Sequence, residues 1–468
     1  MSVPFDARDV VAWSGGHLTH GEAGVRFGGV SIDTRTLGGR DRLFFAIRGP
    51  HHDAHGFLAD AVRAGAAGLV VERGRRLPPS LPGALAVVEV ADTTAALGAV
   101  AAGHRAGFRG PVVAITGSNG KTTTKEMCAA ILSVAGPCLR TRGNLNNAYG
   151  LPLTLLEREE EHEALVVELG MNHRGEIAPL AAIARATVGV ITNVGTAHVE
   201  HLGSRAAIAE EKGDLVAALA PDATAVLNAD DPLVMGQAPR TRGRVLSFGR
   251  SAAADVRAEH VVSLGERGFA FDLVTGEGRS AIRVASLGEV AVCNALAAAA
   301  AALAAGAKLG QAAEGLARLE PVHGRMERVS LARNVILIND TYNANPQSME
   351  VALRSLASLK GASRGIAVLG DMGELGETAE QAHRLTGALV AELGLDFLFA
   401  LGAHAGTTAA GALAGGMDPA RVHVGRDHDE IGVEVARILQ GDDWVLVKGS
   451  RSMRMERIVE ALGRSQGA

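Results

Sequence analysis

The sequence is poor in aromatic residues, in cysteine and in net charge, and each shortage excludes a class of protein. Aromatic residues make up 3% of the chain, too few for a surface on which nucleic-acid bases stack. With 46 basic and 51 acidic residues the formal net charge is −5, which excludes general binding to nucleic acids or membrane surfaces. The three cysteines, Cys128, Cys138 and Cys293, form no CxxC pair and favour a reducing, cytoplasmic setting.

Long apolar runs are also missing. The N-terminus lacks the apolar segment of a signal peptide. The most apolar stretch, residues 290–307, is mostly alanine and contains Asn294 and Gly306, so it predicts a buried helix instead of a membrane span. We therefore expect no nucleic-acid partner and no stable membrane insertion.

Short apolar runs alternate with helical patterns along most of the 468 residues, which predicts an α/β fold. Runs that are apolar throughout are typical of parallel strands covered by helices on both faces. The predicted strands cover residues 111–115, 164–168, 188–192, 335–338, 366–369, 397–401 and 444–447.

Two breaks divide this pattern, at residues 108–111 and 320–324. A single hydrophobic core rarely extends past about 250–300 residues, so a chain of this length is expected to form several domains. We predict three: residues 1–108, a small α/β domain; residues 109–322, a central P-loop ATPase-like domain with a parallel sheet; and residues 323–468, a Rossmann-like α/β domain.

The sharpest motif is Thr-Gly-Ser-Asn-Gly-Lys-Thr-Thr at residues 116–123, between a predicted strand and the helix predicted over 122–132. Glycines let backbone N–H groups approach a phosphate closely, and the helix N-terminus adds positive potential. The motif is shorter than the usual GxxxxGK[ST] loop, because Ile115 stands where the first glycine is expected. The predicted nucleotide-binding residues of this loop are Gly117, Ser118, Asn119, Gly120, Lys121, Thr122 and Thr123.

Three further residues suggest a function only in combination with this loop. Glu168 ends a predicted strand, where it is either a magnesium ligand or a solvated carboxylate. Taken alone, His198 and Lys212 are typical of surface residues.

A larger set of motifs supports one family. They lie at residues 30–35, 43–49, 52–55, 117–123, 141–147, 168–172, 324–325, 339–346, 369–376 and 447–451. In this order they resemble the Mur ligases, ATP-dependent enzymes that form amide bonds in the synthesis of peptidoglycan precursors. The segments Tyr-Asn-Ala-Asn-Pro at 342–346 and Lys-Gly-Ser-Arg at 448–451 favour a member that adds a dipeptide. The Asp-Asn-Pro-Arg motif of members that add diaminopimelate is absent from the sequence.

The resemblance implies a reaction and its partners. The first domain would bind the uridine nucleotide of UDP-N-acetylmuramoyl-tripeptide, the central domain ATP, and the third domain the incoming D-alanyl-D-alanine. The tripeptide carboxylate would be activated as an acyl phosphate. The third residue of the tripeptide, diaminopimelate or lysine, stays open, and we expect a monomer.

The resemblance also implies roles for single residues. The implied catalytic residues are Lys121, Glu168, His198, Lys212 and Arg325. Two Mg²⁺ ions would be held by Thr122, Glu168, His198 and Lys212, the last carbamylated by CO₂ so that it becomes an anionic oxygen ligand. Further nucleotide contacts would come from Asn294, Arg325 and Asp340. The implied substrate-binding residues are Ser31, Thr34, Arg35, Arg48, Asn144, Asn147, Asn343, Asn345, Lys448, Ser450 and Arg451.

Several of these roles have plainer alternatives. Asp340 is also compatible with a helix cap or a turn, and Arg451 with a surface ion pair. The alternatives for the other residues are a helix cap for Ser31 and Thr34, solvated surface arginines for Arg35 and Arg48, and turns for Asn144 and Asn147. The sequence also departs from the family at Val290 and Ala291, where relatives carry His and Asn near the adenine. Adenine recognition therefore has to rely more on Asn294.

Three rival functions stay open at this stage. The first is the same chemistry on another substrate, by another Mur ligase or a folylpolyglutamate synthase. The second is a P-loop kinase or NTPase without ligation. The third is a nucleotide-gated binding protein, against which the complete set of Lys121, Glu168, His198 and Lys212 argues.

Overall fold

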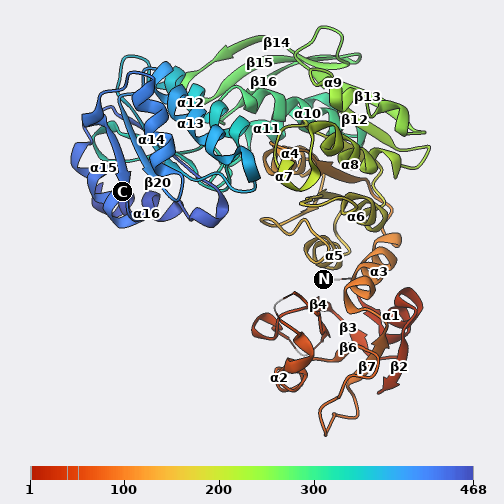
Figure 1. The fold of residues 1–468 in the computed structure, drawn as a ribbon. Helices are drawn as coiled ribbons and strands as arrows, with labels where there is room; N and C mark the ends of the chain where they lie inside the picture. Colours follow the sequence, from red (N-terminus) through yellow and green to blue (C-terminus); the bar gives the residue numbers. More distant parts are fainter. Residues whose placement is uncertain (1–2, 40, 51, 467–468) are drawn as a thin grey trace.

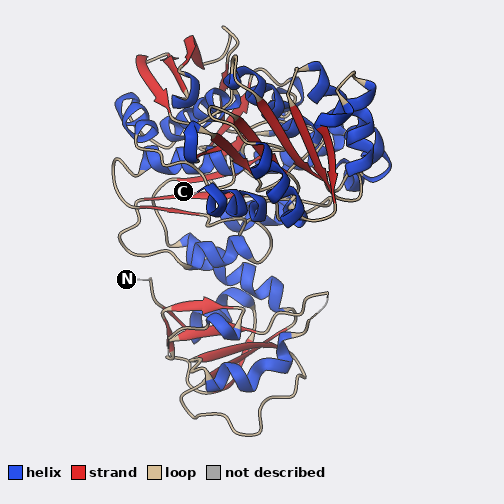
Figure 2. Cartoon of the chain, turned by 90° about the vertical axis from the view of Figure 1, so that its left-hand side faces the viewer, coloured by secondary structure: helices blue, strands red, loops and turns tan. Residues whose placement is uncertain are grey.

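The computed structural model of the chain describes residues 3–39, 41–50 and 52–466, and within them three large β-sheets follow one another along the sequence. The predicted first and last domains begin and end in residues 1–2 and 467–468, which lie outside this description. Figures 1 and 2 show the first sheet at one end of the molecule and the other two sheets together at the opposite end.

The first sheet has the strand order β2-β7-β6-β5-β4 and is parallel except for β2. Its strands are β2 (His17–His20), β4 (Gly29–Ser31), β5 (Arg42–Phe45), β6 (Gly68–Glu72) and β7 (Ala86–Val90). A short antiparallel pair, β1 (Phe5–Asp6) and β3 (Arg26–Phe27), lies beside it. The helices are α1 (Ala7–Ser14), α2 (Leu58–Arg63) and α3 (Thr93–Ala106). Helix α3 also packs on two helices of the next sheet, α5 (Gly150–Leu156) and α6 (Ile177–Ala184).

The central sheet has the order β16-β15-β14-β13-β12-β11-β8-β10-β9. Its strands are β8 (Val112–Thr116), β9 (Cys138–Arg140), β10 (Ala164–Glu168), β11 (Val188–Ile191), β12 (Thr224–Asn228), β13 (Arg244–Gly249), β14 (Val256–Ser263), β15 (Phe269–Thr275) and β16 (Gly278–Val284). Its helices are α4 (Lys121–Leu132), α5 (Gly150–Leu156), α6 (Ile177–Ala184), α7 (Val199–Leu202), α8 (Arg205–Ala217), α9 (Pro232–Met235), α10 (Val290–Ala304) and α11 (Leu309–Ala317).

The parallel part of the central sheet explains its apolar sequence. Every residue of β8 and β10 is buried, because helices cover both faces of these strands. The predicted alanine-rich helix is α10, whose small side chains let it pack closely on α4, the helix that follows the phosphate loop. The sheet is not parallel throughout, since β15 and β16 extend it as antiparallel strands.

The third sheet has the order β17-β18-β22-β19-β20-β21 and is parallel except for β17. Its strands are β17 (Glu327–Ser330), β18 (Ile336–Asp340), β19 (Gly365–Gly370), β20 (Phe397–Leu401), β21 (Val422–Gly425) and β22 (Trp444–Lys448). Its helices are α12 (Pro346–Lys360), α13 (Ala379–Glu392), α14 (Ala405–Ala414), α15 (His428–Ile438) and α16 (Glu456–Gln466).

The α/β class predicted from the alternating pattern is confirmed. The boundaries at residues 108 and 322 stay predictions. None of the helices in the described part of the chain has both the length and the apolar character that crossing a membrane requires.

Candidate active site

The phosphate loop lies between β8 and α4, where the backbone conformation requires glycine at two positions. Gly117 has φ 152° and Gly120 has φ 79°, both in the left-handed region. A Cβ built on Gly117 would lie 1.9 Å from Thr192 Oγ1, and one on Gly120 would lie 2.2 Å from Asn294 Oδ1. The two glycines therefore allow both the turn and the close packing of the loop against its neighbours.

Asn193, which the sequence analysis missed, holds this loop from the neighbouring strand end. Its carbonyl accepts from Ser118 N at 3.0 Å, and its side chain bonds Asn119 N and Asn119 O, each at 3.0 Å. Lys121 folds back over the loop, and its Nζ donates to Gly117 O at 2.7 Å. Burial lowers the pKa of Lys121, and nearby Arg325 adds to this effect while Glu168 opposes it.

Glu168 is buried at the end of β10 and is not the solvated carboxylate of the alternative interpretation. Its Oε2 accepts from Thr122 Oγ1 at 2.9 Å, and its Oε1 accepts from Asn146 Nδ2 at 2.8 Å. Arg325, from the segment that precedes the third sheet, donates to Thr122 Oγ1 at 3.2 Å. Its guanidinium stacks on the Tyr342 ring, with 4.0 Å between the guanidinium carbon and the ring centroid.

The oxygen atoms of Thr122 and Glu168 are the type of ligand that Mg²⁺ prefers. Among the described residues, no cluster of three or more His, Cys, Asp or Glu side chains is arranged to hold a metal ion. The donor pair nevertheless fits Mg²⁺, because this ion keeps several of its waters when it binds to proteins.

His198 and Lys212 lie in different surroundings. His198 has φ 63°, and its Nδ1 is 2.6 Å from Oε2 of Glu374, a residue of the third sheet's loops. Lys212 is 1% exposed within α8. Burial and the positive charge of Lys121 hold the pKa of Lys212 well below its ordinary value. Lys212 is therefore no ordinary surface lysine.

A cavity of about 760 Å³ opens between the phosphate loop and the third sheet. The predicted residues that line it are Ser118, Asn119, Gly120, Lys121, Thr123, His198, Asn294, Arg325, Asp340, Asn343, Asn345, Lys448, Ser450 and Arg451. Thr122, Glu168 and Lys212 lie outside its lining.

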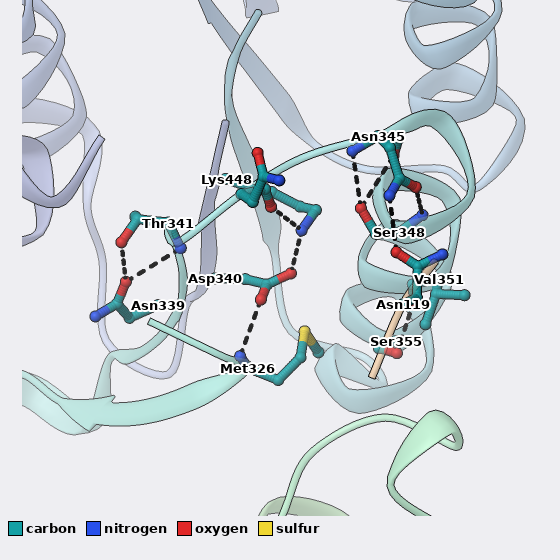
Figure 3. Close-up of polar contacts among 11 residues, drawn as sticks. Asn119, Met326, Asn339, Asp340, Thr341, Asn345, Ser348, Val351, Ser355 and Lys448 are labelled. Carbon is teal, nitrogen blue, oxygen red and sulfur yellow. Dashed lines mark hydrogen bonds and ion pairs between the residues drawn. The ribbon is translucent and has the colours of Figure 1, made fainter. Parts of the chain in front are cut away.

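Asp340 and Lys448 form a buried ion pair at the neighbouring ends of β18 and β22, 2.5 Å apart (Figure 3). Lys448 Nζ also donates to Asn343 O at 2.9 Å, and Asp340 Oδ1 accepts from Met326 N at 3.1 Å. Burial lowers the pKa of Lys448, while the charge of Asp340 opposes this shift. Asp340 is thus held by charge and caps no helix.

Comparison with known proteins identifies the family. The Mur ligase middle domain matches residues 115–302, and the Mur ligase, glutamate ligase domain matches residues 324–451. UDP-N-acetylmuramoyl-tripeptide–D-alanyl-D-alanine ligase of Synechocystis sp. is 38% identical over 439 residues, 94% of this chain and 92% of the relative. The chain belongs to the Mur ligase family.

Solved structures agree with this assignment. MurF from Acinetobacter baumannii superposes with a TM-score of 0.88 at 33% identity, covering 99% of both chains. MurF from Thermotoga maritima in complex with ADP gives a TM-score of 0.82 at 27% identity, covering 94% of this chain and 98% of that one. The predicted resemblance to the Mur ligases is confirmed.

The residues predicted to lie near the adenine are in the first turns of α10. Asn294 is buried at α10, and its Oδ1 accepts from Thr124 Oγ1 at 3.5 Å. Val290 lines the cavity, whereas Ala291 packs into the core of the central sheet. Ala291 is not among the residues that line the cavity, and Asn294, which lines it, stays the predicted adenine contact.

The predicted uridine residues lie in or beside the first sheet, and none of them is among the residues that line the cavity. Ser31 Oγ accepts from Asp33 N at 3.1 Å, Thr34 begins a short 3₁₀ helix capped by Asp33, and Arg35 pairs with Asp33 at 2.6 Å. Arg48 is exposed beside the first sheet. Their contact with the uridine nucleotide stays a prediction.

The predicted sugar-peptide residues Asn144 and Asn147 are both exposed. Asn147 Oδ1 accepts from Tyr149 N and Gly150 N at the start of α5, which is the turn role of the plainer alternative. In the same segment it is Asn146 that reaches Glu168.

On the third-sheet side, Asn345 caps α12 and also donates to Asn119 Oδ1 at 2.7 Å (Figure 3). Ser450 Oγ lies 3.1 Å from Ser452 Oγ. Arg451 pairs with Glu456 at 3.0 Å, with its own side chain 62% exposed, so a second anion can still reach it.

Proposed function

We propose that this Mur ligase uses ATP to join D-alanyl-D-alanine to UDP-N-acetylmuramoyl-tripeptide, giving UDP-N-acetylmuramoyl-pentapeptide, ADP and phosphate. Relatives that match nearly the whole chain are named for this reaction. The structural observation that carries the proposal is a pair of hydrogen bonds to the phosphate loop, from Arg325 to Thr122 and from Asn345 to Asn119. Through it the phosphate loop and the third sheet face one cavity.

The reaction needs activation because a carboxylate is a poor electrophile. The terminal carboxylate of the tripeptide attacks the γ-phosphorus of ATP, ADP leaves, and an acyl phosphate forms. The amine of the dipeptide then attacks the acyl carbon. The tetrahedral intermediate expels phosphate, and loss of the amine proton leaves the amide.

The first step brings two anions together, so the protein has to neutralise charge and align the reacting groups. Lys121 would neutralise charge on the β- and γ-phosphates, and its bond to Gly117 O keeps its ammonium group at the loop. Arg325 lines the cavity and donates to Thr122 Oγ1 of the phosphate loop, which supports a contact of its guanidinium with the γ-phosphate.

The finer part of the proposal concerns two Mg²⁺ ions. Thr122 and Glu168 would hold the first, which supplies charge neutralisation to the phosphate oxygens. His198 and Lys212 would hold the second, provided that Lys212 is carbamylated by CO₂. The lowered pKa of Lys212 supports this modification, since the neutral amine is the form that reacts with CO₂.

The remaining predicted contacts belong to the same proposal. Ser31, Thr34, Arg35 and Arg48 would bind the uridine nucleotide, and Asn144 and Asn147 the sugar and peptide. Asn294 and Asp340 would contact the nucleoside of ATP. Asn343, Asn345, Lys448, Ser450 and Arg451 would contact nucleotide or dipeptide. Because ATP and a UDP-linked substrate are used, we place the reaction in the cytoplasm.

The test is phosphate release from ATP in the presence of UDP-N-acetylmuramoyl-tripeptide, with and without D-alanyl-D-alanine, and product identification by mass. We expect release to require both substrates and the product to be the pentapeptide. Release without the dipeptide would indicate an NTPase. A Lys121→Met variant serves as the control for phosphate released by contaminating enzymes.

A further inference from the structure

The carboxylates that line the cavity differ in their hydrogen-bond and ion-pair partners. Within the described residues, those lining the cavity are Asp230, Asp231, Asp340, Glu350 and Glu374. The first two accept backbone N–H groups, Asp340 pairs with Lys448, and Glu350 pairs with Arg354. Glu374 accepts no backbone N–H and pairs with no arginine or lysine of the described chain. Its ion-pair partner is His198, and its carboxylate stays 45% exposed.

Glu374 is held in an uncommon backbone conformation. It has φ 60°, and its contact partner His198 has φ 63°, so both ends of this contact lie in the left-handed region. Such a conformation costs on the order of 1–3 kcal/mol for a residue other than glycine, and it persists where the surroundings fix it. The side chain is still 45% exposed, so the backbone presents a fixed but accessible carboxylate at the wall of the cavity.

The adjoining loop carries the guanidinium group of Arg451. Ser450 N donates to Asp371 O at 2.9 Å, which joins the segment after β22 to the segment after β19. Arg451 follows Ser450, Glu374 lies three residues after Asp371, and both Arg451 and Glu374 are among the residues that line the cavity. One wall of the cavity therefore offers a carboxylate and a guanidinium from two hydrogen-bonded loops of the third sheet.

This pair is complementary to a zwitterion, because a free dipeptide carries an ammonium group at one end and a carboxylate at the other. We propose that Glu374 recognises the ammonium group of the incoming dipeptide, before this group releases a proton to the solvent and becomes the attacking amine, while Arg451 binds the dipeptide carboxylate. A carboxylate can accept several hydrogen bonds, so Glu374 can hold an ammonium group beside His198. The inference rests on the proposed function and names the residue that selects an acceptor with a free amino end.

The test compares D-alanyl-D-alanine as substrate with N-acetyl-D-alanyl-D-alanine, which lacks the ammonium group, as competitive inhibitor. For Glu374→Gln we expect the KM for the dipeptide to rise about 10–100-fold, the loss typical of a charge-assisted hydrogen bond. The inhibition constant of the acetylated dipeptide should stay within about twofold, because that ligand makes no such bond. Glu374→Asp, which keeps the charge, should recover part of the loss.

A second measurement separates ammonium recognition from an effect on the first step. Trapping of the acyl phosphate by hydroxylamine, without dipeptide, should be unchanged in Glu374→Gln. The matched control is Glu377→Gln, which removes the same charge from an exposed residue of the same segment outside the cavity lining and should leave all constants unchanged.

Two results would overturn the role of Glu374 and leave the proposed function standing. The first is an equal loss of affinity for D-alanyl-D-alanine and for its acetylated form in Glu374→Gln. The second is loss of the trapped acyl phosphate in Glu374→Gln while the wild-type enzyme still makes the pentapeptide. If the wild-type enzyme made no pentapeptide, the proposed function would fail and the inference with it.

Discussion

Asn119, at the tip of the phosphate loop, accepts a hydrogen bond of 2.7 Å from the side chain of Asn345, which caps the first helix after β18. The two residues are 226 positions apart in the sequence. The same side-chain amide therefore caps the N-terminus of α12, where its Oδ1 accepts from Ser348 N, and contacts the phosphate loop through its Nδ2. An acyl phosphate exposed to water would hydrolyse, so we interpret this bond as part of the closure that protects it.

The two roles of Asn345 can be separated by substitution. Asn345→Ser should keep the helix cap, since serine caps as well as asparagine, but is too short to reach Asn119. Asn345→Ala should lose both and cost about 1 kcal/mol in the free energy of unfolding. Small-angle scattering with an ATP analogue and both substrates should show less compaction for both variants. Full compaction of Asn345→Ser would contradict a role in closure.

Gly120 should tolerate no side chain. Alanine there would adopt φ 79° and place its Cβ against the buried Asn294 Oδ1, so we expect at least tenfold weaker ATP binding, corresponding to about 1.4 kcal/mol. The control is Gly143→Ala, where φ is also positive but no atom lies within 4 Å of the added Cβ. Calorimetric titration with ATP measures both variants. Equal affinities would contradict the steric argument.

The buried pair of Asp340 and Lys448 makes a prediction about stability. Lys448→Met leaves Asp340 buried without its countercharge and should lower the free energy of unfolding by about 3–5 kcal/mol. Adding Asp340→Asn removes the uncompensated charge and keeps an acceptor for Met326 N, so the double variant should recover most of the loss. Urea unfolding measures this, and a double variant no more stable than Lys448→Met would count against the explanation.

Much of the fold could be predicted from the sequence because buried parallel strands are apolar throughout. The predicted strands at 164–168 and 397–401 match β10 and β20 residue for residue. Strands β14 and β16 were missed because exposed residues interrupt their apolar pattern. Their pairing depends on neighbours that sequence periodicity does not reveal.

The candidate site, like the fold, could be predicted only in part from the sequence. The phosphate loop could be located from its residues and from the strand and helix predicted on either side of it, since its glycines determine only the local backbone conformation. Asn146 and Glu374 could not be assigned, although both lie in motifs that were noticed. What decides their roles is the direction of one side chain and the docking of the third sheet against the central one, and both are long-range properties.

Asn146 provides the next prediction. Its side chain fixes Glu168 Oε1 while Thr122 contacts Oε2, so Asn146 should orient the carboxylate predicted to bind Mg²⁺. Asn146→Ala should raise the Mg²⁺ concentration needed for half-maximal rate by about 10–100-fold. Binding of ATP without Mg²⁺, measured separately, should not change. If the Mg²⁺ requirement stayed at the wild-type value, Asn146 would have no such role.

Lys212 gives the last prediction, because its burial leaves two chemical states to distinguish. Unmodified, Lys212 would repel Lys121 and a nearby metal ion as a cation and would bring no negative charge as a neutral amine, whereas a carbamate supplies anionic oxygen atoms. Lys212→Ala should therefore lose most activity, and short-chain carboxylic acids should restore part of it by placing a carboxylate in the space left by the side chain. Lys212→Met fills that space, so it should be inactive and not rescued. A carbon-13 carbamate signal from wild-type enzyme in labelled bicarbonate, absent from Lys212→Met, would identify the modified group directly. Full activity of Lys212→Ala without any added acid would refute the carbamate.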